Sequence, residues 1–86
     1  MISVIVICHN YGRFLEKCVS SIIKADNKFL KEIIIIDDSS TDNTKIIAKN
    51  LKKKYKKISL YKKKFKSLSK STNYAISKSS GSWIVK

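Results

Sequence analysis

The sequence has 86 residues, enough for one small domain or for part of one. Hydrophobic residues make up 43% of it, and it has no proline and two glycines, which excludes a disordered linker and a collagen-like chain. The net charge is +13, and no apolar run reaches the ~18 residues that a membrane-spanning helix needs.

Two elements are predicted in the first part of the chain. Residues 2–8, ISVIVIC, form a continuous β-branched run, which is typical of a strand buried on both faces of a parallel sheet. After the polar turn HNYG, helical spacing of apolar residues predicts an amphipathic helix at about 12–25, which the polar residues 26–28 end. Its inward face is expected to hold Phe14, Leu15, Cys18, Val19, Ile22 and Ile23.

The middle of the chain repeats this pattern. Residues 31–37 are predicted to form a second buried strand, and Asp42, Asn43 or Thr44 can cap the helix that follows. Residues 57–61 are predicted to form a short third strand. The inward side chains are expected to be Ile46, Ile47, Leu51 and Tyr55 in the helix, and Ile58 and Leu60 in the strand.

A third helix is predicted at 68–79, carrying Leu68, Ala75 and Ile76 and ended by Gly81. A fourth strand opens at Trp83. The resulting β-α-β-α-β-α-β order predicts an α/β fold, a Rossmann-like parallel sheet with right-handed crossovers and helices on its faces.

The charge is distributed unevenly along the chain. Residues 1–44 hold Arg13 and four lysines against all six acids, whereas residues 45–86 hold fourteen lysines and no acid. Such asymmetry is found in proteins that bind nucleic acid or an anionic membrane, but a general compositional drift toward lysine is the favoured explanation. Lysine clusters at 52–57 and 62–66 flank the third strand, where charged edges discourage aggregation.

The cysteines and the first residues bear on location. Cys8 and Cys18 form no CxxC pair, and we expect both to be reduced and buried in a cytosolic protein. Only Met1 precedes the first apolar run, so no signal peptide is expected there. We therefore predict a cytoplasmic protein, with weak association to an anionic membrane surface as a further hypothesis.

Two polar segments follow strand ends, where open α/β sheets bind ligands. They are CHNYG after the first strand and DDSST after the second. Asp37 could accept amides of its own loop and Asp42 could cap the second helix. However, Asp37 and Asp38 are adjacent, so their side chains leave the strand in opposite directions, and one can brace the loop while the other faces a cleft.

Several ligand classes are excluded by what these segments lack. CHNYGRF has a single glycine and no GxGxxG, which argues against a dinucleotide fold and against a phosphate-binding P-loop. IIIIDDS is similar to the first strand of a phosphoacceptor receiver domain, in which two acids hold magnesium. Such a domain needs a further aspartate at a later strand end, and no acid follows Asp42.

Three blocks together resemble one family. SVIVICHNYGRFLEKCVSSI, EIIIIDDSSTDNT and LSKSTNYAISKSSGSWIV are similar, in order and spacing, to the start of a family 2 glycosyltransferase. These are inverting nucleotide-sugar enzymes of the GT-A fold, and the resemblance covers essentially the whole chain. The acidic block is its most specific part, the first block is moderately specific, and the third is eroded.

The resemblance implies a nucleoside pocket at Ile7, His9, Asp37 and Asp38. Asp38 would accept the N3–H of the base, usually uracil, and Asp37 would support the loop, because a carboxylate selects a base that presents a donor. His9 stands where the family commonly has an aromatic residue against the base, and Ile7 stands where it usually has proline.

Other positions depart from the family pattern. Ser67 and Thr72 stand where glycine and arginine are usual, and Thr72 cannot replace the charge of an arginine near the diphosphate. Lys70 is the candidate for that diphosphate contact. The family's metal-binding acidic motif would follow the strand at Trp83, and its general base comes from a later half, so we predict no catalytic and no metal-binding residue in this chain.

We therefore expect residues 1–86 to be the nucleotide-binding N-terminal part of a glycosyltransferase domain, truncated before the metal motif and inactive alone. The resemblance implies a nucleoside-diphosphate sugar as partner, with UDP as the expected nucleotide, an unknown acceptor hydroxyl, and a divalent cation, Mg or Mn, in the complete enzyme. The alternative is a non-enzymatic basic module that binds nucleic acid or an anionic surface.

Overall fold

The computed structural model describes residues 2–25, 28–80 and 82–85, with 83–85 as backbone alone. Strands and helices alternate through these residues, which confirms the predicted α/β order. None of the helices in the described ranges is long and apolar enough to cross a membrane. The elements are β1 (Ile2–Cys8), α1 (Gly12–Ala25), β2 (Leu30–Asp38), α2 (Thr44–Lys54), β3 (Ile58–Lys63), α3 (Leu68–Lys78) and β4 (Ser82–Val85).

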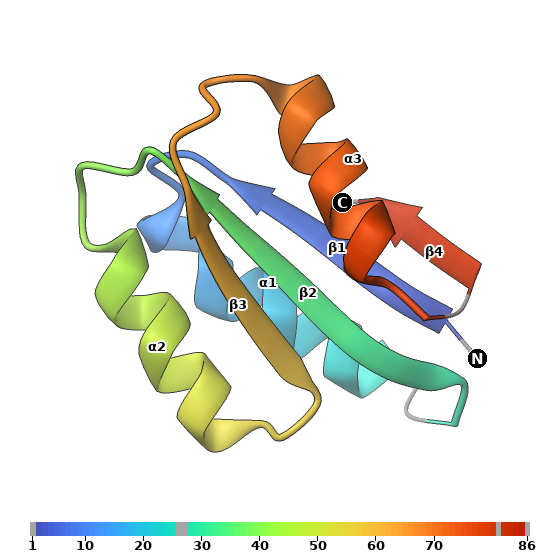
Figure 1. Ribbon diagram of the computed structural model, residues 1–86. Helices are drawn as coiled ribbons and strands as arrows, with labels where there is room; N and C mark the ends of the chain where they lie inside the picture. The colour runs from blue at the N-terminus through green and yellow to red at the C-terminus, as the bar shows by residue number, and fades with distance from the viewer. Residues whose placement is uncertain (1, 26–27, 81, 86) are drawn as a thin grey trace.

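The strands form one sheet in the order β3-β2-β1-β4, and every neighbouring pair is parallel. All four strands therefore point the same way, and the carboxyl ends of β1, β2 and β3 lie at one edge, at the upper left of Figure 1. The helices α1 and α2 pack together on one face of the sheet and α3 lies on the other. Strand β3 forms one edge of the sheet, as predicted.

The side chains of β2 alternate between two cores. Ile33 and Ile35 pack with α1 and α2, whereas Ile34 and Ile36 pack with Ala75 of α3. Period-two alternation of an all-isoleucine run thus feeds both faces, as expected for a strand buried under helices on both sides. The larger core also contains Val4, Val6, Cys8, Leu15, Val19, Leu30, Ala48, Leu51 and Ile58, with Leu60 packed against it.

Three predicted core residues are instead exposed: Phe14 by 52%, Ile46 by 64% and Leu68 by 68%. The buried stripe of α2 is Thr44, Ala48 and Leu51, spaced by four and three, so Ile46 falls on the opposite side of the helix. The ring of Phe14 lies on the surface, 5.7 Å from that of Tyr11.

The observed ends of the strands and helices differ from the predicted ends by a few residues. Strand β2 gains one residue at each end, and β3 continues to Lys63. Helix α3 ends at Lys78, where the Ser79 amide donates to the Ala75 carbonyl. The predicted stop at Gly81, and residues 26–27 of the predicted end of the first helix, lie outside the described residues.

Glu32 connects three segments near the amino ends of the strands. Its Oε2 accepts the Ser3 hydroxyl at 2.6 Å, and the amide and hydroxyl of Ser80, both at 3.1 Å. Burial opposes ionisation, but these hydrogen bonds outweigh it and lower the pKa of the Glu32 carboxyl. Glu32 therefore fixes the segment that leads into β4 against β1.

Candidate functional site

The loop after β1 is tied to the loop after β2 by Asn10. Its Oδ1 accepts the Thr41 amide at 2.7 Å, the Thr41 hydroxyl at 3.2 Å and the Asp42 amide at 3.2 Å. In return, the Asn10 amide donates to the Ser40 hydroxyl oxygen at 3.0 Å. The two polar segments singled out in the sequence thus form a single hydrogen-bonded unit at the carboxyl edge of the sheet.

Asp42 anchors the starts of two helices. Its Oδ1 accepts the Thr44 amide at 2.9 Å and the Thr44 hydroxyl, while Oδ2 accepts the Gly12 amide of α1 at 3.2 Å. The hydroxyl bond from Thr44 is the main reason that the pKa of Asp42 is lowered. Of the three predicted caps, Asn43 occupies the N-cap position but makes no side-chain cap bond, so Asp42 performs that task.

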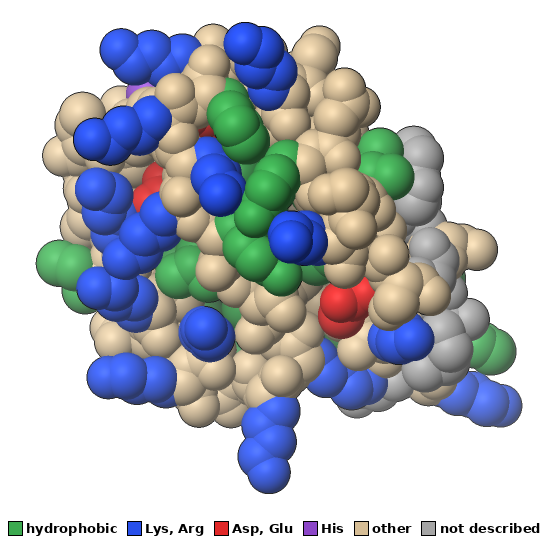
Figure 2. Space-filling model, viewed as in Figure 1, with side chains coloured by type: hydrophobic (Ala, Val, Ile, Leu, Met, Phe, Trp, Pro, Cys, Tyr) green, Lys and Arg blue, Asp and Glu red, His purple; other side chains and the backbone are tan. Residues whose placement is uncertain are grey.

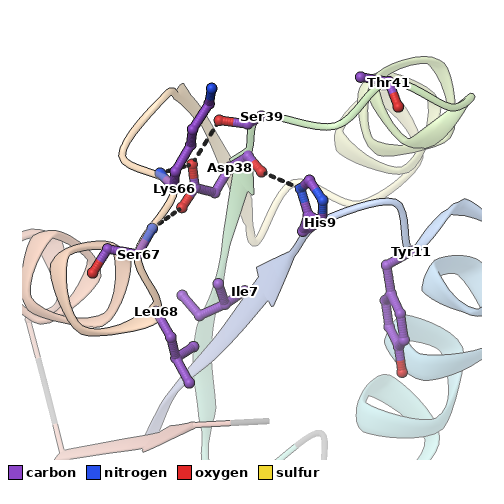
Figure 3. A pocket seen from close by; sticks show the side chains of 9 residues that line it. All are labelled: Ile7, His9, Tyr11, Asp38, Ser39, Thr41, Lys66, Ser67 and Leu68. Atoms are coloured by element: carbon purple, nitrogen blue, oxygen red, sulfur yellow. Dashed lines mark hydrogen bonds between the residues drawn. The ribbon is translucent and has the colours of Figure 1, made fainter.

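Asp38 organises the segment between β3 and α3 (Figure 3). Its Oδ1 accepts the Lys66 amide at 2.9 Å and the Ser39 hydroxyl at 3.0 Å. Its Oδ2 accepts the Ser67 amide at 3.1 Å and the buried Ser71 hydroxyl at 2.9 Å. Each oxygen therefore accepts two hydrogen bonds, which satisfies the ionised carboxylate with donors from its own chain.

The pKa of Asp38 reflects this cage. Burial of the side chain raises the pKa, but the hydrogen bonds from Lys66, Ser71, Ser67 and Ser39 together outweigh burial and lower it to about 2. The carboxylate is therefore ionised at neutral pH, with its charge balanced by fixed dipoles and not by a lysine ammonium.

Among the residues that the structure describes, three non-glycine residues have a positive φ, and all three lie at this edge: Asn10 at 52°, Ser39 at 62° and Lys66 at 53°. Left-handed backbone at a residue with a Cβ is uncommon and costs free energy. Each of the three adjoins or contacts the loops around Asp38. Such a concentration of unfavourable backbone is found at ligand-binding sites, where the surrounding structure holds it in place.

A hollow of about 760 Å³ opens between these loops and the start of α3. Figure 3 shows Ile7 and Leu68 on one side and His9 on the other, with Asp38 above Ile7 and its carboxylate directed toward Lys66 and Ser67. The His9 Nδ1 lies 2.9 Å from the Asp38 carbonyl oxygen, so Nδ1 donates and the ring is held in place. The lining residues are Ile7, His9, Tyr11, Asp38, Ser39, Thr41, Lys66, Ser67 and Leu68.

Asp37 lies on the opposite face of the sheet, beside α2. Its side chain is 1% exposed, and neither carboxylate oxygen has a hydrogen-bond partner in the described structure. Burial, and then the charge of Asp37, raise the pKa of the neighbouring Cys8 thiol to about 12. Cys8 and Cys18 are both reduced, as predicted, although Cys18 is only half-buried.

The structure brings together three of the predicted nucleotide-binding residues, Ile7, His9 and Asp38. Asp37 does not line this hollow, and the contacts that brace the loops come from Asn10, Asp38 and Asp42. The roles of Asp37 and Asp38 toward a nucleotide stay predictions. Lys70 is exposed on the first turn of α3, outside the hollow lining, so its diphosphate contact also stays a prediction.

Lys66, Ser67, Leu68 and Ser71 were not predicted as site residues: Ser67 was noted only as a departure from the family pattern, and Leu68 was assigned to the core. Lys66 and Ser67 act through backbone amides, which any residue type carries. The only available signal was Ser67, a preferred N-cap residue placed directly before a predicted helix, and its hydroxyl does accept the Lys70 amide.

Known proteins have the same fold, and some are similar in sequence to part of this chain. The chain superposes on a mannosyltransferase from Pyrobaculum calidifontis, solved with GDP-Man and Mn²⁺, with a TM-score of 0.83, 21% identity, and coverage of 93% of this chain and 24% of that one. It superposes on S. aureus TarS 1–349 with a TM-score of 0.80, 23% identity, and coverage of 98% and 26%. These similarities confirm the GT-A, Rossmann-like fold.

Curated relatives are similar in sequence over shorter stretches. An uncharacterized glycosyltransferase of Mycoplasma genitalium is 37% identical over 60 residues, which are 69% of this chain and 20% of that protein. Glycosyltransferase GlyG of Streptococcus pneumoniae is 46% identical over 44 residues, 51% of this chain and 14% of that protein. The matched part is thus a fifth or less of these relatives.

The profile described as glycosyl transferase family 2 matches residues 3–85, nearly the whole chain. That span includes both loops at the carboxyl edge, the cage around Asp38 and the strand β4. The chain therefore belongs to glycosyl transferase family 2.

Proposed function

We propose that this chain binds the nucleotide of a nucleoside-diphosphate sugar, as part of an enzyme that transfers the sugar to an acceptor hydroxyl with inversion. The observation that carries the proposal is the hollow at the carboxyl edge, in which Ile7, His9 and Asp38 meet. In α/β sheets ligands bind at this edge. Family membership supplies the reaction class.

The hollow offers a flat base two kinds of contact. Ile7 and Leu68 provide apolar surface, and the fixed imidazole of His9 provides a flat ring. Asp38 provides a hydrogen-bond acceptor. Of the four hydrogen bonds that it accepts, the one from the Ser39 hydroxyl can most easily be replaced by a hydrogen bond from an N–H of the base. The Lys66 and Ser67 donors are backbone amides, and Ser71 is fully buried.

The donor nucleotide is expected to be UDP, because uracil presents a single N3–H to an acceptor. The mannosyltransferase from Pyrobaculum calidifontis was solved with GDP-Man, and guanine also presents N–H donors to a carboxylate. The preference for uracil or guanine therefore depends on the size of the hollow as well as on Asp38, and binding of UDP must be compared with binding of GDP.

A divalent cation is expected in the complete enzyme, where it would stabilise the diphosphate leaving group. Within the described residues no three His, Cys, Asp or Glu side chains are grouped so that they could hold a metal ion. The residues present therefore do not fit the cation, and we assign no catalytic step to this chain. Cytoplasmic location also stays a prediction.

Titration of the 86-residue chain with UDP and GDP, followed by the backbone amide signals in two-dimensional NMR, tests the proposal. We expect UDP to shift the amides of Ile7, His9, Lys66 and Leu68, which line the hollow. GDP at equal concentration should shift them less. Shifts confined to residues far from the hollow, or no shift with either nucleotide, would contradict the proposal.

A pair of matched variants tests the base slot. His9→Ala removes the flat ring that lines the hollow and should weaken UDP binding by about tenfold, equivalent to ~1.4 kcal/mol. Phe14→Ala removes another exposed aromatic ring, on α1 outside the hollow, and should leave binding unchanged. Equal weakening by both variants would show that His9 does not contact the base.

A further inference from the structure

A second hollow, of about 590 Å³, lies on the other side of the β2 loop. Five lysines from three segments line it: Lys45 on α2, Lys62 and Lys63 on β3, and Lys64 and Lys66 after β3. Figure 2 shows basic side chains gathered on the left of the molecule, where Figure 1 places α2 and β3. We call this site the lysine hollow.

The lysine hollow lacks matching negative charge. Asp37 is the only acid that lines it, and in the described part of the chain none of its five lysines forms an ion pair with a carboxylate. The pKa of Lys62 is lowered, mainly by its side-chain contact with Lys49. Slight burial and the positive charges of Lys49 and Lys45 lower it further. Crowded ammonium groups of this kind repel one another and attract an anion.

Polar donors complete the surroundings of the lysine hollow. Ser39, Ser40 and Thr41 contribute hydroxyl groups to its lining. The positive end of α2 lies beside it, since Lys45 is in the first turn of that helix, and this turn contains no acidic residue. Ammonium groups, hydroxyls and a helix start are the groups with which proteins bind phosphate.

Lysine is abundant over the whole second half of the chain, so abundance alone does not indicate a site. The positions of the lysines along α2 do distinguish them. Lys52, Lys53 and Lys54 lie in its last turn, where a cation is favourable beside the helix C-terminus. Lys45 lies in the first turn, where a cation is unfavourable, and it lines the same hollow as Lys62.

We propose that the lysine hollow binds a multiply charged phosphate group, carried by a soluble phosphate compound or by a lipid headgroup. The site adjoins the nucleotide hollow and shares Ser39, Thr41 and Lys66 with it. The two differ in their other residues: Ile7, His9 and Asp38 line only the first, and Lys45, Lys62 and Lys64 line only the second. The buried carboxylate of Asp37 lies beneath the lysines and reduces their mutual repulsion when no anion is bound.

Pyrophosphate titration at about 0.15 M salt, the physiological ionic strength, provides the test. We expect the amide signals of Lys45, Lys62 and Lys64 to shift more than those of Ile7 and Leu68. The triple variant Lys45→Gln, Lys62→Gln, Lys64→Gln should bind pyrophosphate at least about tenfold more weakly, because it loses the charged donors that the site uses. The control is Lys52→Gln, Lys53→Gln, Lys56→Gln, with the same change in net charge and an expected loss under about twofold.

Sedimentation with vesicles distinguishes the two sources of phosphate. Binding to vesicles of phosphatidylglycerol and phosphatidylcholine, lost in the first triple variant and absent with phosphatidylcholine alone, would identify a headgroup. Pyrophosphate binding without vesicle binding would identify a soluble compound.

Other outcomes would overturn the proposal. Equal losses in the two triple variants would mean that only the overall charge attracts the anion. Pyrophosphate shifts confined to Ile7 and Leu68 would assign the anion to the nucleotide hollow. Binding to a single-stranded oligonucleotide that both triple variants weaken equally would show diffuse attraction of polyanions instead of a site. Absence of any pyrophosphate shift would also reject it.

Discussion

Asp37 and Asp38 are neighbours in sequence, yet their carboxylates lie on opposite faces of the sheet and in opposite electrostatic environments. Asp38 accepts four hydrogen bonds on the face of α3, whereas Asp37 accepts none on the face of α2. Strand geometry alone separates them, because successive side chains alternate. The two acids should therefore respond differently to substitution.

The pKa of Asp38, about 2 in the folded chain, lies below the ~3.9 expected in an unfolded chain. A lowered pKa means that Asp38 stabilises the fold above pH ~4, and that this contribution disappears as the pH falls through about 2. We expect the free energy of unfolding, measured by urea denaturation, to decrease across that interval.

Asp38→Asn isolates this contribution. At pH 7 the variant should be less stable by roughly 1–3 kcal/mol, because an amide NH₂ would face backbone donors in place of a carboxylate oxygen. At pH 2 the difference from the unchanged chain should become small. A constant difference at all pH values would show that Asp38 does not titrate with the fold.

Lys66 offers a second test at the residue scale, since its backbone has a φ of 53°. Lys66→Gly should raise the free energy of unfolding by roughly 0.5–1 kcal/mol, because glycine relieves the left-handed strain although it also gains entropy when unfolded. Lys64→Gly, at an exposed position without positive φ, is the matched control and should be neutral or destabilising. Thermal denaturation of both variants provides the measurement.

At the scale of elements, sequence periodicity located all four strands and three helices, because β-branched runs and helical spacing are local properties. It failed at Ile46, Phe14 and Leu68, which are apolar but exposed. In α2 the small residues Thr44 and Ala48 are buried, because this side of the helix packs against α1 and the sheet. Hydrophobicity gives small residues little weight, so Ile46 was predicted to face inward, although Leu51 was predicted correctly.

Leu51→Ala and Ile46→Ala test this assignment of the α2 faces. Leu51 is 4% exposed, and its truncation should cost about 2–4 kcal/mol through lost burial and a cavity. Ile46 is 64% exposed, and its truncation should change stability by less than about 0.5 kcal/mol. Chemical denaturation at neutral pH measures both, and similar costs would contradict the orientation of the helix.

The candidate site was predictable only in part. Strand ends pointed to the segments CHNYG and DDSST, because parallel strands bring their carboxyl ends to one edge. The family resemblance then singled out Ile7, His9, Asp37 and Asp38, and all but Asp37 line the hollow. The other half of the hollow comes from the segment before α3, which reaches Asp38 through backbone amides 28 and 29 residues away in sequence. Such contacts depend on the path of the chain and leave no trace in residue type.

At the scale of the whole molecule, the charge acts against compactness. The chain carries +13 in a molecule whose Cα radius of gyration is 11.8 Å, little more than one Debye length at 0.1 M salt. Mutual repulsion among the lysines should therefore weaken folding at low ionic strength. We expect the melting temperature to rise between about 0.01 M and 0.5 M sodium chloride, as screening increases. A melting temperature that stays constant or falls would show that repulsion among the lysines does not significantly lower the stability of the fold.

The shared anchoring of α1 and α2 at Asp42 has a consequence for cooperativity. One carboxylate holds the first amide of α1 and the first amide of α2, and the Thr44 hydroxyl also accepts the Tyr11 amide at 3.0 Å. Neither helix can fray at this end without releasing the other. The two β-α units should therefore open together, with one common free energy for amide hydrogen exchange in both first turns, and Asp42→Ala should lower that protection in both helices at once.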